Sequence, residues 1–130
     1  METNQKKILI IDDDEMILQS LSTTLLKEGF EVLNANDGDA GLVEALNKEP
    51  DLIITDIEMK KVSGMEVLKE IRKYGDWGAK VPIIILTNYD ANEEIMKGIV
   101  ADSPSLYILK SKVNPTIILE KVKELLGTTT

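Results

Sequence analysis

Four short apolar runs, each followed by a polar residue, are the feature of this chain that most constrains its fold. If the runs are parallel strands of one sheet, their carboxyl ends lie side by side, and open parallel sheets bind ligands along that edge. The edge would hold several carboxylates, a hydroxyl and one ammonium group, a set that suits a hard cation and a phosphoryl group. The runs and the residues after them are 8–11 with Asp12, Asp13 and Asp14, 52–55 with Asp56, 83–86 with Thr87, and 106–109 with Lys110.

Helix-like stretches separate the apolar runs, and this alternation is typical of an α/β fold with a parallel sheet. A weaker strand is expected at 31–35, which gives five β/α units in one domain. The continuous apolar character of the first, third and fourth strands indicates that helices cover both faces of the sheet. The expected domain covers residues 6–127, with frayed ends at 1–5 and 128–130.

Signals for helix ends and apolar stripes lie between the strands. A serine and a glutamate three residues apart form a capping box, and an asparagine followed by proline begins a helix where proline is tolerated best. Five helices are therefore expected, the second at about 39–48. The end signals are Asp14 and Gly29, Ser63 with Glu66, Asp90 with Glu93 for a helix to about Val100, and Asn114 with Pro115 and Gly127. The apolar residues that recur at helical spacing in the first helix are Met16, Ile17, Leu21, Leu25 and Leu26. The residues expected to face inward in the later helices are Leu42, Val43, Leu46, Val67, Leu68, Ile71, Ile118, Val122 and Leu125.

The composition excludes several classes of protein and site. Its 130 residues suffice for one domain, and a hydrophobic fraction of 43% permits a single core. The chain has no cysteine and no histidine, so a bound metal must have oxygen ligands and catalysis by a histidine of its own is excluded. A net charge of −8 argues against nucleic acid or an anionic membrane as the direct partner. No apolar segment resembles a signal peptide or a membrane span, so a cytoplasmic location is expected.

Asp12, Asp13 and Asp56 are candidate ligands of a magnesium ion. Carboxylates held close together repel one another unless a cation neutralises them. Magnesium prefers oxygen ligands and typically takes one or two carboxylates together with waters and phosphate oxygens. A carboxylate can also attack phosphorus and form an aspartyl phosphate. In such a site Lys110 would supply positive charge, and Thr87 would donate a hydrogen bond to a phosphoryl oxygen.

Each of these residues alone also has an ordinary structural explanation. An aspartate after a strand is usually a turn residue or a helix cap, and Asp14 is assigned the role of cap. A threonine that ends a strand is often there for its β propensity, and a lysine there is often a solvated charge. The coincidence at four strand ends outweighs these explanations, because a parallel sheet brings all four ends to one place.

The same residues resemble the receiver domain of two-component response regulators, the CheY-like family, over roughly residues 6–126. In order and at family spacing, the matching motifs are very specific. They are 7–15 with the acidic pair, 50–59 and Gly64 around the phosphoacceptor, 82–87 with the switch hydroxyl, and 107–110 with the switch aromatic and the lysine. The resemblance implies a doubly wound, flavodoxin-like sheet of five parallel strands with five helices. Its strand order 2-1-3-4-5 is taken from the family, as chemotaxis receivers show it.

The resemblance also implies a phosphorylation-operated signalling switch, and not an enzyme beyond its own phosphorylation and dephosphorylation. A sensor histidine kinase or a phosphotransfer protein would be the phosphodonor. Phosphorylation would shift the population between two packings. The surface of the helix expected at 90–100, the strand at 106–109 and the last helix would then bind an unknown protein target or a second copy of the chain. The implied roles are Asp56 as phosphoacceptor; Asp12, Asp13, Asp56 and the backbone carbonyl of Glu58 as magnesium ligands; Thr87 and Lys110 as contacts to the phosphoryl oxygens; and Thr87 and Tyr107 as switch residues.

Three positions depart from the family pattern. Lys60 stands where a proline usually follows the phosphoacceptor, so the loop after Asp56 is expected to be less rigid. Asn88 stands where a smaller residue usually follows the switch hydroxyl. Ser111 stands where a cis-proline usually follows Lys110. Because a cis bond before another residue costs about 2.5–4 kcal/mol, this loop is expected to differ from the usual one.

Two other functions remain open. A magnesium-dependent phosphohydrolase of the haloacid-dehalogenase type would also form an aspartyl phosphate, but it places an Asp-x-Asp motif after the first strand and carries a substrate-binding insertion. A receiver-like module that works without phosphorylation is favoured by Lys60 and Ser111 and opposed by the complete set of acidic and switch residues. The sequence does not distinguish a stand-alone receiver from one domain of a longer protein.

Overall fold

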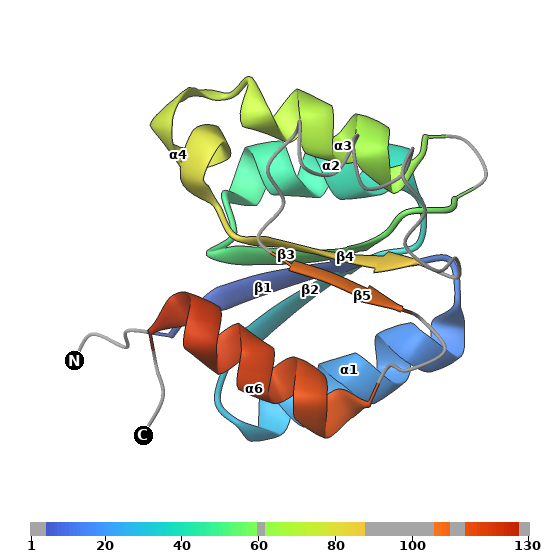
Figure 1. Cartoon of the computed structure of the whole chain (residues 1–130), viewed down its shortest axis with the longest axis vertical. Coiled ribbons are helices and arrows are strands. Elements are labelled where there is room, and N and C mark those ends of the chain that lie inside the picture. The colour runs from blue at the N-terminus through green and yellow to red at the C-terminus, as the bar shows by residue number, and fades with distance from the viewer. Residues whose placement is uncertain (1–4, 60–61, 88–105, 110–113, 128–130) are drawn as a thin grey trace.

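The described part of the chain contains a sheet of five parallel strands. The structure is a computed structural model that describes residues 5–59, 62–87, 106–109 and 114–127. The strands are β1 (Lys7–Ile11), β2 (Glu31–Ala35), β3 (Leu52–Asp56), β4 (Ile83–Thr87) and β5 (Leu106–Leu109). Their order across the sheet is β2-β1-β3-β4-β5, and every neighbouring pair is parallel (Figure 1). The predicted fold class and strand order are therefore confirmed.

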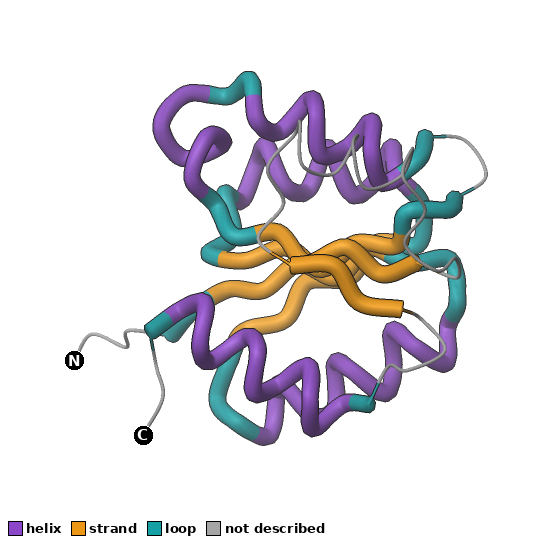
Figure 2. The backbone as a smooth tube through the Cα atoms, in the orientation of Figure 1, coloured by secondary structure: helices purple, strands orange, loops and turns teal. Residues whose placement is uncertain are grey.

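Apolar residues cover both faces of this sheet. In β1, Ile8 and Ile10 belong to one core cluster and Leu9 and Ile11 to the other, because successive side chains of a strand point to opposite faces. All residues of β3 and β4 are buried. Figure 2 shows the strands as one layer between two layers of helices. Burial of each of these aliphatic side chains stabilises the folded state by about 1.5–3 kcal/mol. The strands therefore hold the groups at the carboxyl edge of the sheet in defined positions.

Five described helices cover the two faces of the sheet. They are α1 (Glu15–Lys27), α2 (Gly38–Lys48), α3 (Gly64–Arg72), α4 (Gly75–Lys80) and α6 (Pro115–Leu126). Figure 1 shows α1 and α6 on one face and α2, α3 and α4 on the other. The predicted side-chain caps are confirmed at Asp14, Ser63 and Asn114, and Gly127 ends α6 with a φ of 69°. No helix in the described ranges is both long enough and apolar enough to cross a membrane.

Some apolar residues of the helical patterns are exposed, among them Val43, which was expected to face inward. Their exposed fractions are 80% for Met16, 56% for Leu26 and 57% for Val43. In α2 the small residues Gly41 and Ala45 face the sheet, and a Cβ atom on Gly41 would lie only 2.5 Å from the side chain of Ile11. This close approach rotates the predicted apolar stripe, so Val43 points outward. The helix expected at 90–100 and the ends at 1–4 and 128–130 lie outside the described residues.

Helix α4 was not predicted, because its six residues, GDWGAK, show no apolar periodicity. Two side chains tie it to its surroundings. Nη1 of Arg72 donates hydrogen bonds to the carbonyl oxygens of Gly78 (2.9 Å) and Val81 (2.7 Å). Nε1 of Trp77 donates to the carbonyl oxygen of Pro50 (2.8 Å), just before β3. Tertiary hydrogen bonds, which local propensity does not reveal, thus fix α4 at the amino edge of the sheet.

Arg72→Met is expected to lower the free energy of unfolding by about 1.5–3 kcal/mol, because two carbonyl groups lose a charged donor. Methionine retains much of the apolar length of arginine, so the loss would reflect hydrogen bonding more than packing. Urea unfolding followed by circular dichroism measures the change. The control Lys69→Met removes the same charge from an exposed position of α3 and should change stability by no more than about 0.5 kcal/mol. Equal losses in both variants would contradict the role given to Arg72.

Candidate functional site

Three aspartate carboxylates meet at the carboxyl ends of β1 and β3. These strands are neighbours, and Ile11 pairs with Thr55, so the residues that follow leave the sheet side by side. One carboxylate oxygen from each of Asp12, Asp13 and Asp56 lies within 4.8 Å of the others. Asp12 and Asp56 are buried, with 0% and 1% exposed, whereas Asp13 is exposed. The acidic side chains that the sequence placed at this edge do lie together, with one of them open to solvent.

Hydrogen bonds of its main chain and its side chain fix Asp12 between β1, β2 and α1. Its N–H donates to the carbonyl oxygen of Ala35 (3.1 Å), and its Oδ1 accepts from the N–H of Asp14 (2.8 Å). Asp14 in turn caps α1, since its Oδ1 accepts from the N–H of Met16 (3.0 Å) and of Ile17 (3.4 Å). The third aspartate of the run is thus a helix cap, as predicted, and it orients the first through the backbone.

Asp56 is held by the residues on both sides of it. In the sheet it pairs with Leu86, whose carbonyl oxygen accepts from the N–H of Ile57 (2.8 Å). Its Oδ1 accepts from the N–H of Glu58 (3.3 Å), which restrains the carboxylate from its own loop. Gly64, at the start of α3, packs against the carbonyl oxygen of Asp56. The carboxylate therefore stands at a defined place beside Asp12.

The other predicted site residues are described in part. Thr87 ends β4 with 0% exposed and pairs with Leu109, the last described residue before Lys110. Tyr107 is placed in β5 by its backbone alone. The remaining residues with predicted roles or unusual loops, Lys60, Asn88, Lys110 and Ser111, lie outside the described residues. The roles of Thr87, Tyr107, Lys110 and the Glu58 carbonyl, and the Lys110–Ser111 conformation, stay predictions.

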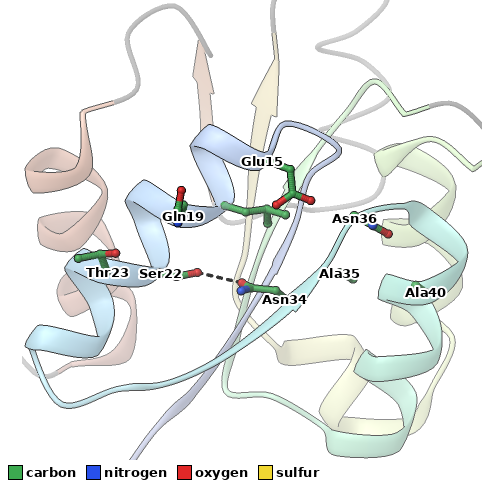
Figure 3. A pocket seen from close by; sticks show the side chains of 9 residues that line it. Glu15, Gln19, Ser22, Thr23, Asn34, Ala35, Asn36 and Ala40 are labelled. Atoms are coloured by element: carbon green, nitrogen blue, oxygen red, sulfur yellow. Dashed lines mark hydrogen bonds between the residues drawn. The ribbon is translucent and has the colours of Figure 1, made fainter.

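A polar pocket that the sequence did not predict lies beside the carboxylates. Its volume is about 550 Å³, and it opens between α1, the end of β2 and the start of α2 (Figure 3). Glu15 and Gln19 line it from α1, and Ser22 Oγ donates a hydrogen bond to Oδ1 of Asn34, another lining residue (2.9 Å). Ala35, which also lines it, accepts the hydrogen bond from Asp12. The pocket is a neighbour of the carboxylate cluster and not the cluster itself.

The donor set at the carboxylate cluster fits a magnesium ion. It consists of oxygen atoms alone, and magnesium takes few carboxylates while keeping waters and phosphate oxygens. The two buried carboxylates, Asp12 and Asp56, would be neutralised by the ion, and exposed Asp13 leaves an opening for water or a phosphoryl group. Sheet and site together define a class: an open α/β protein with a cluster of carboxylates, which could hold a metal ion, at the carboxyl edge of its parallel strands.

Comparisons with known proteins place the chain within that class. The family model described as the response regulator receiver domain matches residues 8–123. The alkaline phosphatase synthesis transcriptional regulatory protein PhoP of Bacillus subtilis is 36% identical over 94 residues, which cover 72% of this chain and 38% of that protein. The probable transcriptional regulator ycf27 of Cyanophora paradoxa is 41% identical over 87 residues, which cover 67% of this chain and 35% of that protein. The matches thus span little more than a third of these curated relatives.

Solved structures show the same likeness along nearly the whole chain. A CheY-like response regulator receiver domain protein from Methanospirillum hungatei has a TM-score of 0.87 and 35% identity, with 95% of each chain covered. The chemotaxis response regulator CheY4 of Vibrio cholerae has a TM-score of 0.85 and 30% identity, with 95% of this chain and all of that chain covered. The chain belongs to the response regulator receiver domain family. It is a phosphoacceptor signalling switch of the two-component type.

Proposed function

We propose that Asp56 accepts a phosphoryl group from the phosphohistidine of a sensor histidine kinase or a phosphotransfer protein. The observation that carries this proposal is the position of its carboxylate, which lies at the end of a central strand within 4.8 Å of two further carboxylates. A carboxylate oxygen of Asp56 would attack phosphorus, and the bond from phosphorus to the histidine nitrogen would break. The histidine leaves with the electron pair of that bond, and an acyl phosphate is formed.

Asp12, Asp13, Asp56 and the carbonyl oxygen of Glu58 would hold magnesium. Bound there, the ion would neutralise the carboxylates and the negative charge of the phosphoryl group. Two hydrogen bonds would orient Asp12 for this role: its N–H donates to the carbonyl oxygen of Ala35, and its Oδ1 accepts from the N–H of Asp14. As a receiver domain, the protein would supply positions and charge for the transfer of a phosphoryl group to and from its own aspartate. We propose that it catalyses only its own phosphorylation and dephosphorylation.

The switch would connect Asp56 to the far edge of the sheet. Thr87 and Lys110 would contact the phosphoryl oxygens, and Thr87 and Tyr107 would change position together. The register supports this route, because Asp56 pairs with Leu86, the residue before Thr87. The altered surface would comprise segment 90–100, β5 and α6, and it would bind a protein target or a second copy of the chain. We place this exchange in the cytoplasm, where kinases have access to ATP.

Incubation of the wild-type chain with magnesium and acetyl phosphate tests the proposed function. Intact mass spectrometry is expected to show one added phosphoryl group, and a chelator should prevent its addition, because the carboxylates would repel the incoming anion. No added mass with any phosphodonor would favour a module that works without phosphorylation. Turnover of small phosphate monoesters would instead favour a phosphohydrolase.

A further inference from the structure

Two glycines make unusually close contacts with the segment that follows the phosphoacceptor. Gly38 lies in the first turn of α2, and a Cβ atom there would overlap the carbonyl oxygen of Val62 and lie 2.8 Å from its Cβ. Gly64 begins α3, and a Cβ atom there would overlap the carbonyl oxygen of Asp56 and lie 2.8 Å from Cα of Ile57. Real Cβ atoms essentially never approach other atoms below 3.0 Å. Any other residue at either position would therefore displace the backbone it touches.

We propose that Gly38 is a positioning residue for the phosphoacceptor, because it lets α2 rest directly on Val62 and so holds Gly64 against the Asp56–Ile57 peptide. The proposal rests on the role proposed for Asp56. Helix α2 carries none of the predicted site residues, but in this proposal it fixes the position of the chain that leaves β3. The contacts of the two glycines would restrain the described residues on both sides of this connection, Asp56–Ile57 and Val62.

Helix α2 is anchored independently of Val62, so an overlap at Gly38 would move the segment and not the helix. Oδ1 of Asp37 accepts from the N–H of Ala40 (2.7 Å) and fixes the first turn. One turn on, Gly41 packs against Ile11 of β1, which places α2 directly on the sheet. Val62 lies between β3 and α3 and belongs to neither, so no hydrogen-bond ladder of a helix or strand holds it against such an overlap.

A displacement of Val62 would reach Asp56 through Gly64, two residues later. The N–H of Gly64 donates to the carbonyl oxygen of Ile57 (2.9 Å), and the N–H of Ile57 donates to Leu86 of β4 (2.8 Å). The N–H of Glu58, next in the same loop, donates to Oδ1 of Asp56 (3.3 Å). Moving Gly64 therefore disturbs the peptides that orient the carboxylate, whereas Asp12 and Asp13 stay attached to β1.

Gly38→Ala is expected to slow phosphorylation of Asp56 by acetyl phosphate about 10–100-fold, because a misplacement of about 1 Å can cost that much in rate. Magnesium affinity, measured by titration, should change less than the rate. Alanine favours helix over glycine, so an uncrowded glycine in α2 would tolerate this change or gain stability from it. The control Asp39→Ala alters the exposed neighbouring position and should leave the rate close to that of the wild type.

Hydrogen exchange of the Gly64 amide gives a readout that does not depend on phosphorylation. The exchange rate should rise at least about tenfold in Gly38→Ala and stay unchanged in Asp39→Ala. Only Gly38→Ala is expected to weaken the hydrogen bond from the Gly64 N–H to the carbonyl oxygen of Ile57. Adding Val62→Gly to Gly38→Ala removes the 2.8 Å contact and should restore part of both the rate and the protection. Wild-type rate and wild-type exchange in Gly38→Ala would overturn the proposal. Failure of the wild type to be phosphorylated would overturn the proposed function, and the exchange data would still decide whether Gly38 holds the segment.

Discussion

In magnesium and acetyl phosphate, Asp56→Asn is expected to keep its unmodified mass under conditions in which the wild-type chain gains one phosphoryl group. An asparagine amide has nearly the shape of the carboxylate but lacks a nucleophilic oxygen, so the reaction with phosphorus is lost. Its Oδ1 can still accept the hydrogen bond from the N–H of Glu58, and the buried strand end should keep its packing. Intact mass spectrometry measures the loss, and circular dichroism confirms that the variant is folded.

The control for this variant is Asp76→Asn, which removes one negative charge at the opposite edge of the sheet. Asp76 is an exposed residue of α4, and Trp77 beside it bonds to Pro50 at the start of β3. This variant should be phosphorylated like the wild type. A phosphoryl group that persists on Asp56→Asn would contradict the assignment, and peptide mapping would then test Asp13, the exposed carboxylate of the cluster.

The sheet could be predicted because its strands are apolar on both faces. A parallel strand under two layers of helices needs no alternation of polar residues, so runs such as 52–55 stand out in the sequence. Helix ends at Asp14 and Asn114 could be predicted for a similar reason, since a side-chain oxygen that accepts from the first free N–H groups is a local signal. The predicted strand order came from the resemblance to the family and not from these signals.

Features that depend on the approach of two distant segments escaped prediction. Val43 was wrongly assigned to the sheet face because its spacing fits a helix stripe, whereas the contact of Gly41 with Ile11 decides which side of α2 is buried. Helix α4 has no periodicity and depends on hydrogen bonds from Arg72 and Trp77. The close approach of Gly38 to Val62 likewise depends on the positions of two distant segments, and a glycine in the sequence does not reveal it.

In the candidate site, too, one feature could be predicted from the sequence and another could not. The proximity of Asp12, Asp13 and Asp56 follows from strand adjacency, since residues after neighbouring parallel strands must leave the same edge. Their unequal burial does not follow, because it depends on how α1 begins and on the Asp14 cap. This difference in burial matters for the chemistry. The negative charges of the two buried carboxylates, Asp12 and Asp56, repel each other more strongly than they would in water, and the exposed carboxylate of Asp13 leaves the cluster open to solvent.

Magnesium is expected to raise the melting temperature of the wild-type chain, and Asp12→Asn is expected to abolish this rise. In the absence of magnesium, Asp12→Asn is expected to melt at a higher temperature than the wild type. Two like charges about 4 Å apart near a protein surface repel by about 4 kcal/mol at an effective dielectric constant of about 20. Neutralising buried Asp12 removes part of that repulsion, and the asparagine oxygen can still accept from the N–H of Asp14. The same change removes a carboxylate that magnesium would need.

A concentration of magnesium about 100 times its dissociation constant stabilises the folded state by about 2.7 kcal/mol, which corresponds to a rise on the order of 10 °C for a domain of this size. Differential scanning calorimetry with and without the ion measures both effects, and Asp76→Asn should respond to magnesium like the wild type. An unchanged wild-type melting temperature at high magnesium would contradict the proposed ligands. The sharper test is which protein melts at the higher temperature: Asp12→Asn without magnesium, and the wild type with it. A variant that merely damaged the fold would melt below the wild type both with and without the ion.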